Sequence, residues 1–315
     1  MTLAITCPGQ GSQAVGMGKA LAEAFPSARA VFEEVDAALG EKLSTLMFKG
    51  PLETLTLTAN AQPALMAVSV AGMRALEAEA GLDPARDVGF FAGHSLGEYS
   101  ALACARALSV TDAARLLRLR GEAMQKAVPV GEGAMAVLLG LEWEQAVAVA
   151  AEAAQGQVCD AANDNGPGQA VVSGHKAAVE RAVEIAKGKG AKRAMLLPVS
   201  APFHCALMKP AADAMAEALA KASIARPAAS IVANVTAGPE SDPAVIRANL
   251  VKQVTGTVRW RESVGWMAAN GVDSFLEVGA GKVLTGLSKR MAPAAQSSAV
   301  GTPDDVRAFA AARNS

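Results

Sequence analysis

The sequence predicts an α/β fold in which a parallel sheet forms the larger part and a ferredoxin-like βαββαβ unit is inserted into it. Three observations support this prediction. Short apolar runs alternate with amphipathic helical patterns over residues 1–128. A serine stands between two glycines at 93–97, where an apolar run meets a helical pattern. From residue 133 to 199 the spacing changes, and short apolar runs and helical patterns follow one another in the order βαββαβ.

The N-terminal part begins with a predicted strand at residues 1–6, which runs directly into Pro8 and Gly9. A second strand is predicted at Val88–Ala92, because its residues are apolar or small and it ends at a glycine-flanked turn. Helices are predicted at 98–104 and at 111–128, where apolar residues recur at helical spacing. This succession of strand, turn and helix is typical of parallel α/β folds.

The inserted unit is predicted from four apolar runs and two helical patterns. The strands are expected at 134–139, 157–161, 169–173 and 193–199, and the helices at 142–154 and 175–187. A compact unit inserted in a larger domain leaves a cleft at the seam, where functional sites tend to lie. We therefore expect the site at the border between the two units.

The remaining chain returns to the larger unit. A helix is predicted at 209–222, a strand at 230–235, a helix at 245–254 and a strand at 274–278, and the alanine-rich tail after Met291 is expected to be peripheral. The predicted domains are therefore a large domain of residues 1–130 and 200–315, and a small domain of residues 131–199.

Composition excludes several classes of function. The 315 residues are 51% hydrophobic, and 29 Lys and Arg against 30 Asp and Glu give a formal net charge of −1. Such a chain is globular, and it has no overall field that would attract nucleic acid or an anionic membrane. The N-terminus lacks the basic region of a signal peptide, and no stretch is suited to span a bilayer.

The four cysteines are scattered, without the paired spacing of a metal site or a disulfide framework. They indicate reduced, buried thiols, a cytoplasmic location and no bound metal. The sequence leaves the oligomeric state open and is compatible with a monomer.

Gly93-His94-Ser95-Leu96-Gly97 matches the G-x-S-x-G pattern of a nucleophile elbow. Glycines on both sides let the backbone turn tightly between strand and helix, which exposes the Ser95 hydroxyl above the end of the sheet. The following helix directs its N-terminal amides at the same place, where an oxyanion would develop. Ser95 is therefore the predicted nucleophile.

A serine nucleophile needs a base, and the chain has three histidines. His94 is adjacent to Ser95, so its side chain should diverge, and His175 opens a helix, where a surface histidine is the simplest interpretation. His204 follows the last strand of the inserted unit, at the seam, and is the predicted base by elimination. A satisfied structural histidine is the alternative. No Asp or Glu between Ser95 and His204 is a convincing third member, so a dyad with a neutral orienting group is possible.

Arg120 carries information about the substrate. It falls within the apolar stripe of the 111–128 helix, whereas the other charged residues of that helix lie on the opposite face. An inward-facing arginine left unpaired costs about 3–5 kcal/mol, so it needs an anionic partner. Two interpretations remain open: a buried salt bridge to a carboxylate of this chain, or a bidentate clamp for a substrate carboxylate.

Two glycine loops have competing interpretations. The loop at 8–13 follows the first strand and is expected to open a helix, and Gly9, Gly11 and Ala14 weakly match a dinucleotide fingerprint. Alternatively, it is a tight loop beside the elbow that supplies an amide to an oxyanion hole. The second loop, at 279–282, lacks the upstream glycine and the Ser or Thr of a phosphate-binding loop.

Taken together, the motifs resemble malonyl-CoA:acyl-carrier-protein transacylases over nearly the full chain. They are PGQGSQ at 8–13, NAQPAL at 60–65, GHSLGEYSAL at 93–102, Arg120-Gly121 with Met124-Gln125, NDNGPGQAVVSGH at 163–175, PVSAPFHCALM at 198–208, and Gln253 ahead of Val258-Arg259-Trp260. Each motif is short, but the order and spacing of the whole set are specific to this family.

The resemblance implies an α/β-hydrolase-like large domain with an inserted ferredoxin-like small domain. It implies Ser95 as nucleophile, His204 as base and Arg120 as the clamp on the malonyl carboxylate. It further implies that the main-chain carbonyl of Gln253 orients His204, which accounts for the missing acid. The amides of Gln10 and Leu96 would form the oxyanion hole.

The resemblance also implies which residues contact substrate, namely Arg120, Met124, Phe203, Gln62 and Asn163. Some members have serine at the position of Phe203, and in related acyltransferase domains phenylalanine there goes with malonyl and serine with methylmalonyl.

The implied activity is ping-pong transfer of a malonyl group from malonyl-CoA to the phosphopantetheine thiol of an acyl carrier protein. No cofactor is implied, because the CoA thioester is a substrate and the partner carries the phosphopantetheine. Two alternatives stay open. A serine thioesterase or hydrolase shares the elbow and the base but leaves Arg120 unexplained, and a dinucleotide-binding protein would use the loop at 8–13.

Overall fold

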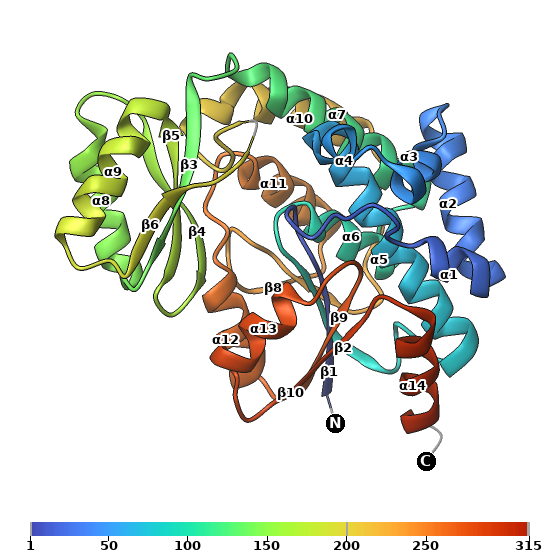
Figure 1. Cartoon of the computed structure of the whole chain (residues 1–315). Coiled ribbons are helices and arrows are strands. Elements are labelled where there is room, and N and C mark those ends of the chain that lie inside the picture. Colours follow the sequence, from blue (N-terminus) through green and yellow to red (C-terminus); the bar gives the residue numbers. More distant parts are fainter. Residues whose placement is uncertain (1, 200, 314–315) are drawn as a thin grey trace.

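The structure is a computed structural model that describes residues 2–199 and 201–313. Met1 of the predicted first strand, Ser200 at the predicted start of the second large-domain segment, and Asn314 and Ser315 at its end lie outside the described residues. The described chain is a mixed α/β structure with two separate sheets (Figure 1). One sheet is mainly parallel and the other is antiparallel.

The larger sheet has the strand order β10-β9-β1-β2-β7-β8. Its strands are β1 (Thr2–Cys7), β2 (Val88–Gly93), β7 (Ser230–Val232), β8 (Pro239–Glu240), β9 (Val272–Val278) and β10 (Gln296–Val300). All neighbours pair in parallel except β7 and β8, which are antiparallel. The predicted strand at 88–92 is therefore confirmed, and the predicted strand at 230–235 is shorter than expected.

Both faces of this sheet are covered by helices, as its alternating residues require. Within β1, Ile5 belongs to the main apolar core, whereas its neighbour Ala4 packs in a separate cluster with Trp260 and Leu284. In β9, Leu276 likewise belongs to the main core, and its neighbour Phe275 belongs to the separate cluster. Successive side chains of a strand point to opposite faces, so this division places one core on each side.

The segment between β1 and β2 differs from the expected alternation of strands and helices. Five helices fill it, and no strand of the described chain lies between them: α1 (Lys19–Ala24), α2 (Pro26–Leu39), α3 (Leu43–Lys49), α4 (Leu52–Thr56) and α5 (Thr58–Ala80). Most of α5 is buried, including the apolar run Ala64–Val68 that could equally be a core strand in sequence. An apolar run inside a long helix is not distinguishable from a strand by its periodicity alone.

Two further helices follow the nucleophile turn. They are α6 (Gly97–Cys104) and α7 (Val110–Ala127), close to their predicted bounds. The side chain of Ser109 caps α7 by accepting a hydrogen bond from the Asp112 amide at 2.9 Å. α7 packs against α5, α2 and α10, so its apolar stripe faces the interior.

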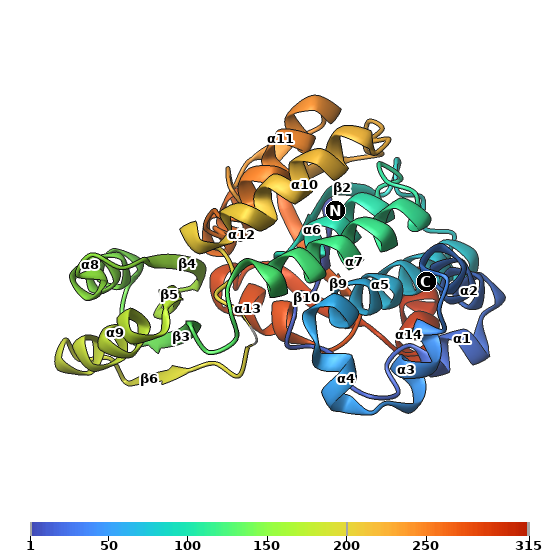
Figure 2. The same ribbon diagram turned by 90° about the horizontal axis from the view of Figure 1, so that it is seen from above.

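The smaller sheet has the order β4-β5-β3-β6, and all its pairs are antiparallel. It is formed in the predicted order βαββαβ by β3 (Gly133–Leu139), α8 (Trp143–Ala154), β4 (Cys159–Gly166), β5 (Gln169–His175), α9 (Lys176–Gly188) and β6 (Arg193–Leu196). The two helices cover one face (Figure 2). β4 begins two residues later and continues further than predicted, and β6 ends earlier.

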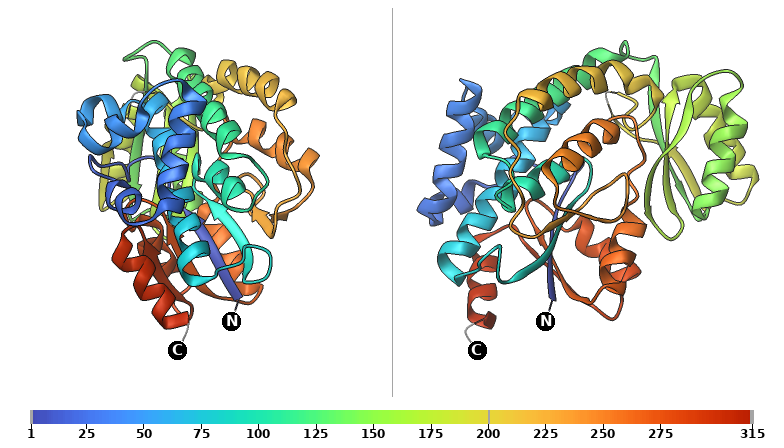
Figure 3. Two further views of the ribbon diagram at one scale, coloured as in Figure 1. Left: turned by 90° about the vertical axis from the view of Figure 1, so that its right-hand side faces the viewer. Right: turned by 180° about the vertical axis from the view of Figure 1, so that it is seen from behind.

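The C-terminal part contains more structure than expected. It comprises the 3-10 turn Ala206–Met208 and the helices α10 (Lys209–Lys221), α11 (Pro243–Gln253), α12 (Trp260–Ala269), α13 (Val283–Met291) and α14 (Pro303–Arg313). The tail after Met291 is not merely peripheral, because β10 pairs with β9 and α14 packs against α5 (Figure 3). Among the described helices, none is both long enough and apolar enough to cross a membrane.

Candidate active site

Ser95 lies in the sharp turn between β2 and α6, beyond the carboxyl ends of the parallel strands. Its φ of 53° is in the left-handed region that side chains rarely adopt. A Cβ on Gly93 would come within 1.8 Å of the Gly97 carbonyl oxygen, and one on Gly97 within 2.3 Å of the Cys7 carbonyl oxygen. Both glycines are therefore required by close approach of the backbone, as the elbow pattern predicts.

His204 contacts the hydroxyl of Ser95. The Nε2 atom of His204 lies 2.7 Å from Ser95 Oγ, and Nδ1 faces the main-chain oxygens of Gln253 at 2.9 Å and Gly256 at 3.1 Å. Because carbonyl oxygens only accept, Nδ1 carries the proton and Nε2 is free to accept from the serine. Ser95, His204 and the main-chain oxygen of Gln253 therefore lie in contact, as the sequence predicted.

The environment of His204 keeps it neutral. Burial, followed by the nearby positive charge of Arg120, lowers the pKa of His204 to about 3. His94 does not contact the serine hydroxyl, since its Nε2 donates to Asn165 Oδ1 at 2.7 Å. His175 accepts a hydrogen bond from the Val158 amide at 2.9 Å. Of the three histidines, His204 is therefore the one placed to accept the serine proton.

Arg120 is 1% exposed, and its guanidinium also reaches the Ser95 hydroxyl. Its guanidinium donates to Gln62 Oε1 at 2.7 Å, to Gln253 Oε1 at 2.9 Å and to Ser95 Oγ at 3.2 Å. Among the described residues, no carboxylate forms an ion pair with Arg120, and its Nε makes no hydrogen bond. The described chain therefore holds no direct salt bridge to Arg120. Its hydrogen-bond partners are neutral, and the buried carboxyl of Glu98 acts on it only electrostatically, without contact.

Gln10 and Leu96 border the cavity next to Ser95. Within the described residues, neither main-chain nitrogen donates a hydrogen bond to a protein acceptor. The Gln10 side chain is fixed by the hydroxyl of Thr58, which donates to Gln10 Oε1 at 2.7 Å. Two free amides next to a half-buried nucleophile are available to an oxyanion.

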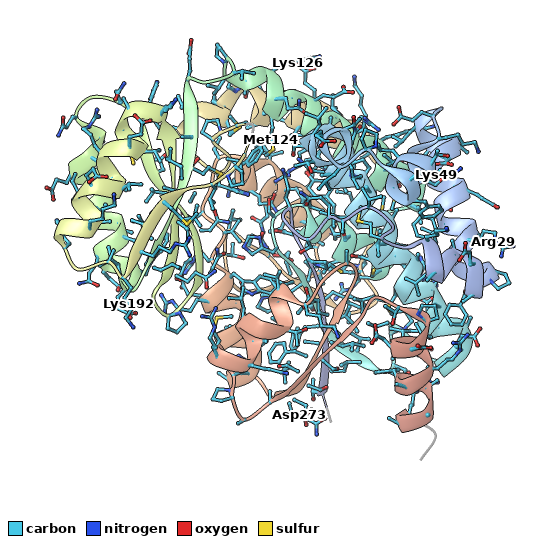
Figure 4. The ribbon with its side chains drawn as sticks, in the orientation of Figure 1. Arg29, Lys49, Met124, Lys126, Lys192 and Asp273 are labelled. Carbon is cyan, nitrogen blue, oxygen red and sulfur yellow. The ribbon has the colours of Figure 1, made fainter. Side chains whose placement is uncertain are left out.

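A cavity of about 490 Å³ opens over Ser95 between the two sheets. All the predicted substrate-binding side chains line it, namely Gln62, Arg120, Met124, Asn163 and Phe203. Gln62 is held by Thr58 Oγ1 at 3.0 Å, while Asn163 Oδ1 is buried without a partner in the described chain. Met124 is buried, with its Sδ 3.7 Å from Gln62 Nε2, whereas Lys126 of the same helix points outward (Figure 4).

A larger cavity of about 610 Å³ lies elsewhere, between α14 and the edge of the larger sheet. It is lined by groups such as Leu276, Phe309 and Arg313 and holds none of the predicted site residues. Among residues 2–199 and 201–313, no cluster of three His, Cys, Asp or Glu side chains is arranged to hold a metal ion.

The loop at 8–13 lies beside the elbow, as the second of its two interpretations requires. It does not open a helix, because α1 begins only at Lys19. A Cβ on Gly9 would come within 2.8 Å of the His94 carbonyl oxygen, so Gly9 lets this loop pack against the elbow. A dinucleotide fingerprint needs a helix N-terminus directly after the glycines, so that interpretation is wrong here.

The comparisons with known proteins agree with this geometry. The acyl transferase domain family matches residues 5–303. The chain is 48% identical over 305 residues to the malonyl CoA-acyl carrier protein transacylase of Escherichia coli K12, covering 97% of each chain. The chain belongs to the malonyl-CoA:acyl-carrier-protein transacylase family.

Solved structures of this transacylase family superpose closely. The acyl-carrier-protein S-malonyltransferase of Bartonella henselae is 56% identical, with a TM-score of 0.97 and full coverage of both chains. A malonyl-transacylase solved in complex with a type II polyketide acyl carrier protein is 44% identical, with a TM-score of 0.95, covering 99% of this chain and 100% of that one.

Sequence reasoning missed three polar residues that hold the transacylase site together. Asn234 accepts a hydrogen bond from the Ser95 amide at 2.8 Å and donates to the Gly93 carbonyl at 2.7 Å. Glu98 contacts both Asn234 and Gln253, and Asn165 accepts from His94. Asn234 follows a strand of the larger sheet, a position at which site residues gather, and that was the available signal.

Proposed function

We propose that this protein transfers a malonyl group from malonyl-CoA to the phosphopantetheine thiol of an acyl carrier protein, through a malonyl ester on Ser95. In the first half-reaction, His204 Nε2 takes the hydroxyl proton while Ser95 Oγ attacks the thioester carbonyl carbon. The amides of Gln10 and Leu96 bind the oxyanion that forms. Collapse of the intermediate breaks the carbon–sulfur bond, and the CoA sulfur takes the proton from His204.

The second half-reaction reverses these roles. The carrier's thiol gives its proton to His204, and its sulfur attacks the ester carbonyl. The carbon–oxygen bond to Ser95 breaks, and the serine oxygen recovers the proton from His204. The carbonyl of Gln253 keeps Nδ1 protonated throughout, so the same nitrogen, Nε2, accepts and returns each proton.

The observation that carries this proposal is the buried guanidinium of Arg120, which forms no direct ion pair within the described residues and lies within hydrogen-bond reach of Ser95 Oγ. Its partners Gln62 and Gln253 are neutral amides that orient it without balancing its charge. An acyl group on Ser95 that ends in a carboxylate supplies an anion in direct contact, whereas a neutral acyl group leaves the guanidinium buried without one. This selects a dicarboxylic acyl group such as malonyl over acetyl.

Phe203, Met124 and Asn163 complete the proposed pocket. Phe203 and Met124 are buried apolar walls next to the proposed base and clamp. The unpaired Asn163 Oδ1 lines the same cavity and offers an acceptor to a substrate N–H. As proposed, the reaction draws on no metal or cofactor.

The finer description of the architecture belongs to the same proposal. The strand order β4-β5-β3-β6 with both helices on one face supports a ferredoxin-like small domain of residues 131–199. The elbow after a parallel strand supports an α/β-hydrolase-like large domain of residues 1–130 and 200–315. Four free, buried cysteines support a reducing cytoplasmic location.

Replacement of Arg120 tests the proposal directly. We expect Arg120→Ala to lose malonyl transfer by about a hundredfold or more, because a buried charge pair is worth several kcal/mol. Acetyl transfer should persist or rise, since acetyl makes no use of the guanidinium. Transfer of both acyl groups from CoA to holo carrier protein measures this, with Ser95→Ala as the inactive control. Equal loss of malonyl and acetyl transfer would contradict the assignment and identify a purely structural arginine.

A further inference from the structure

Glu98 is a wholly buried carboxyl group in the first turn of α6, directly behind the nucleophile turn. It does not line the cavity over Ser95. Its Oε2 atom accepts two hydrogen bonds, from Gln253 Nε2 at 2.8 Å and from the Asn234 amide at 3.1 Å. A buried ionisable side chain is costly, and the mechanism above makes no direct use of this one.

The first hydrogen bond fixes which end of the Gln253 amide faces Arg120. Nε2 of Gln253 donates to Glu98 Oε2 and to the Ser95 carbonyl at 3.0 Å, so Oε1 is left to accept from Arg120. Rotating the amide by half a turn would set its NH₂ group against the guanidinium, with donors facing donors. Glu98 accepts at the end where the NH₂ group now lies, and with the Ser95 carbonyl it selects the orientation that holds Arg120.

The second hydrogen bond reaches the nucleophile turn itself. The main-chain amide of Asn234 donates to Glu98. The side chain of Asn234 accepts from the Ser95 main-chain amide with Oδ1 and donates to the Gly93 carbonyl with Nδ2. The main-chain oxygen of Gln253 meanwhile accepts from His204. One carboxyl oxygen therefore sits between the two residues that hold the nucleophile, the base and the arginine.

We propose that Glu98 is a positioning residue for acyl selectivity: as a hydrogen-bond acceptor, it fixes the Gln253 amide so that Arg120 presents its guanidinium to a carboxylate on Ser95. This inference rests on the proposed malonyl transfer. Glu98 acts by accepting hydrogen bonds and not by its charge, because Gln253 Nε2 and the Asn234 main-chain amide both donate to its Oε2 atom. Burial raises the pKa of Glu98 to about 7, so protonated and ionised forms both occur near neutrality, and each has an oxygen that can accept.

The proposal separates two substitutions at this position. Glu98→Gln keeps an oxygen for both donors. Glu98→Leu removes the shorter of the two hydrogen bonds that Gln253 Nε2 donates and leaves the Ser95 carbonyl as its remaining close acceptor, so the amide is held more weakly. We expect Glu98→Leu to reduce the ratio of malonyl to acetyl kcat/KM by about tenfold or more, the value of a hydrogen bond to a charged group. Glu98→Gln should restore that ratio to within about threefold of the starting protein, well inside the tenfold loss.

Glu277 provides the matched control. It is also a wholly buried glutamate that accepts main-chain amides, from Leu284 at 3.2 Å and Thr285 at 2.7 Å, but it does not contact Gln253 or Arg120. We expect Glu277→Leu to lower the unfolding temperature while leaving the malonyl-to-acetyl ratio unchanged. The ratio therefore reports positioning, which a general loss of stability does not alter.

Three results would overturn the inference. An unchanged ratio in folded Glu98→Leu would remove Glu98 from selectivity, and an equal loss in Glu98→Gln would assign the effect to charge. If Glu98→Leu does not fold, Gln253→Met replaces it, since that variant removes the same amide but keeps the main-chain oxygen for His204. An unchanged ratio there would equally reject the inference. Failure of the unsubstituted protein to transfer malonyl would reject the proposed function instead.

Discussion

The proposed base, His204, is oriented by main-chain carbonyl groups where many serine hydrolases use a carboxylate. The Gln253 and Gly256 oxygens accept from Nδ1, and they carry only partial charge. A carboxylate would raise the pKa of the imidazole, whereas here burial and Arg120 lower it to about 3. A neutral histidine suits a site that must also leave the positive charge of Arg120 for the substrate.

This environment makes a specific prediction for stability against pH. In the unfolded chain His204 gains a proton below about pH 6.5, but in the folded chain it stays neutral down to about pH 3. The unfolded state therefore binds more protons in that window, so the contribution of His204 to the free energy of unfolding falls as the pH falls. The loss is at most about 1.4 kcal/mol for each pH unit.

Comparison with His204→Gln, which cannot titrate, isolates this effect from His94 and Glu98. The free energy of unfolding, measured in urea at a series of pH values, should fall more steeply on acidification in the unsubstituted protein than in the variant. A difference between the two proteins that stays constant from pH 6.5 to pH 3 would show that folding leaves the histidine pKa unchanged.

Residues differ in how far the sequence alone could predict them. Ser95 was predicted because its glycine neighbours form a local pattern, and Arg120 because one charge interrupts an apolar helical stripe. His204 followed by elimination. Glu98 and Asn234 were not predicted, because their roles depend on partners more than 130 positions away in the chain, such as Ser95 with Asn234 and Glu98 with Gln253.

At the scale of elements, α7 sets the position of Arg120 through its close contact with α5. The next residue, Gly121, makes this contact possible, since a Cβ there would lie 2.5 Å from Ala59 Cα. Gln125, one turn further along α7, accepts from the Ala59 amide at 3.0 Å. The two helices therefore lock together beside the guanidinium.

We predict that Gly121→Ala destabilises the protein by about 1–3 kcal/mol, because the added methyl group forces α7 away from α5. Malonyl transfer should fall with it, as Arg120 moves with the helix. Gly286 of α13 is the matched control, since a Cβ there meets nothing within 4 Å. Gly286→Ala should stabilise the protein by about 0.5–1 kcal/mol through its helix propensity. Urea unfolding compares the two, and equal stability of Gly121→Ala and the unsubstituted protein would refute the close contact.

The elements themselves were predicted best where their pattern is local. The order of the inserted unit and the bounds of α6 and α7 followed from apolar spacing and from glycines. The helices between β1 and β2 were harder, because much of α5 is buried all round and carries little helical periodicity. The strand β10 escaped prediction because Gln296–Val300 is a half-exposed edge strand with only one neighbour.

At the scale of the whole molecule, the site exists only where the two sheets meet. The larger sheet supplies Ser95 at the end of β2, and the smaller sheet supplies Asn163 and Asn165 from β4. The pair Asp164–Arg261, at 2.8 Å, joins β4 to α12 at this border. The sequence predicted a cleft at this border. The contacts that join the two sides, such as Asp164 with Arg261, could be identified only from the structure.

In the proposed reaction, Ser95 carries an acidic acyl group between two thiols, and the site protects this ester from water. Intact mass measured after mixing with malonyl-CoA, and again after adding holo acyl carrier protein, tests this most directly. We expect a single malonyl adduct on the protein, absent in Ser95→Ala, that then disappears as malonyl-carrier protein forms. An adduct that decays to free malonate without loading the carrier, or one that persists in Ser95→Ala, would contradict it.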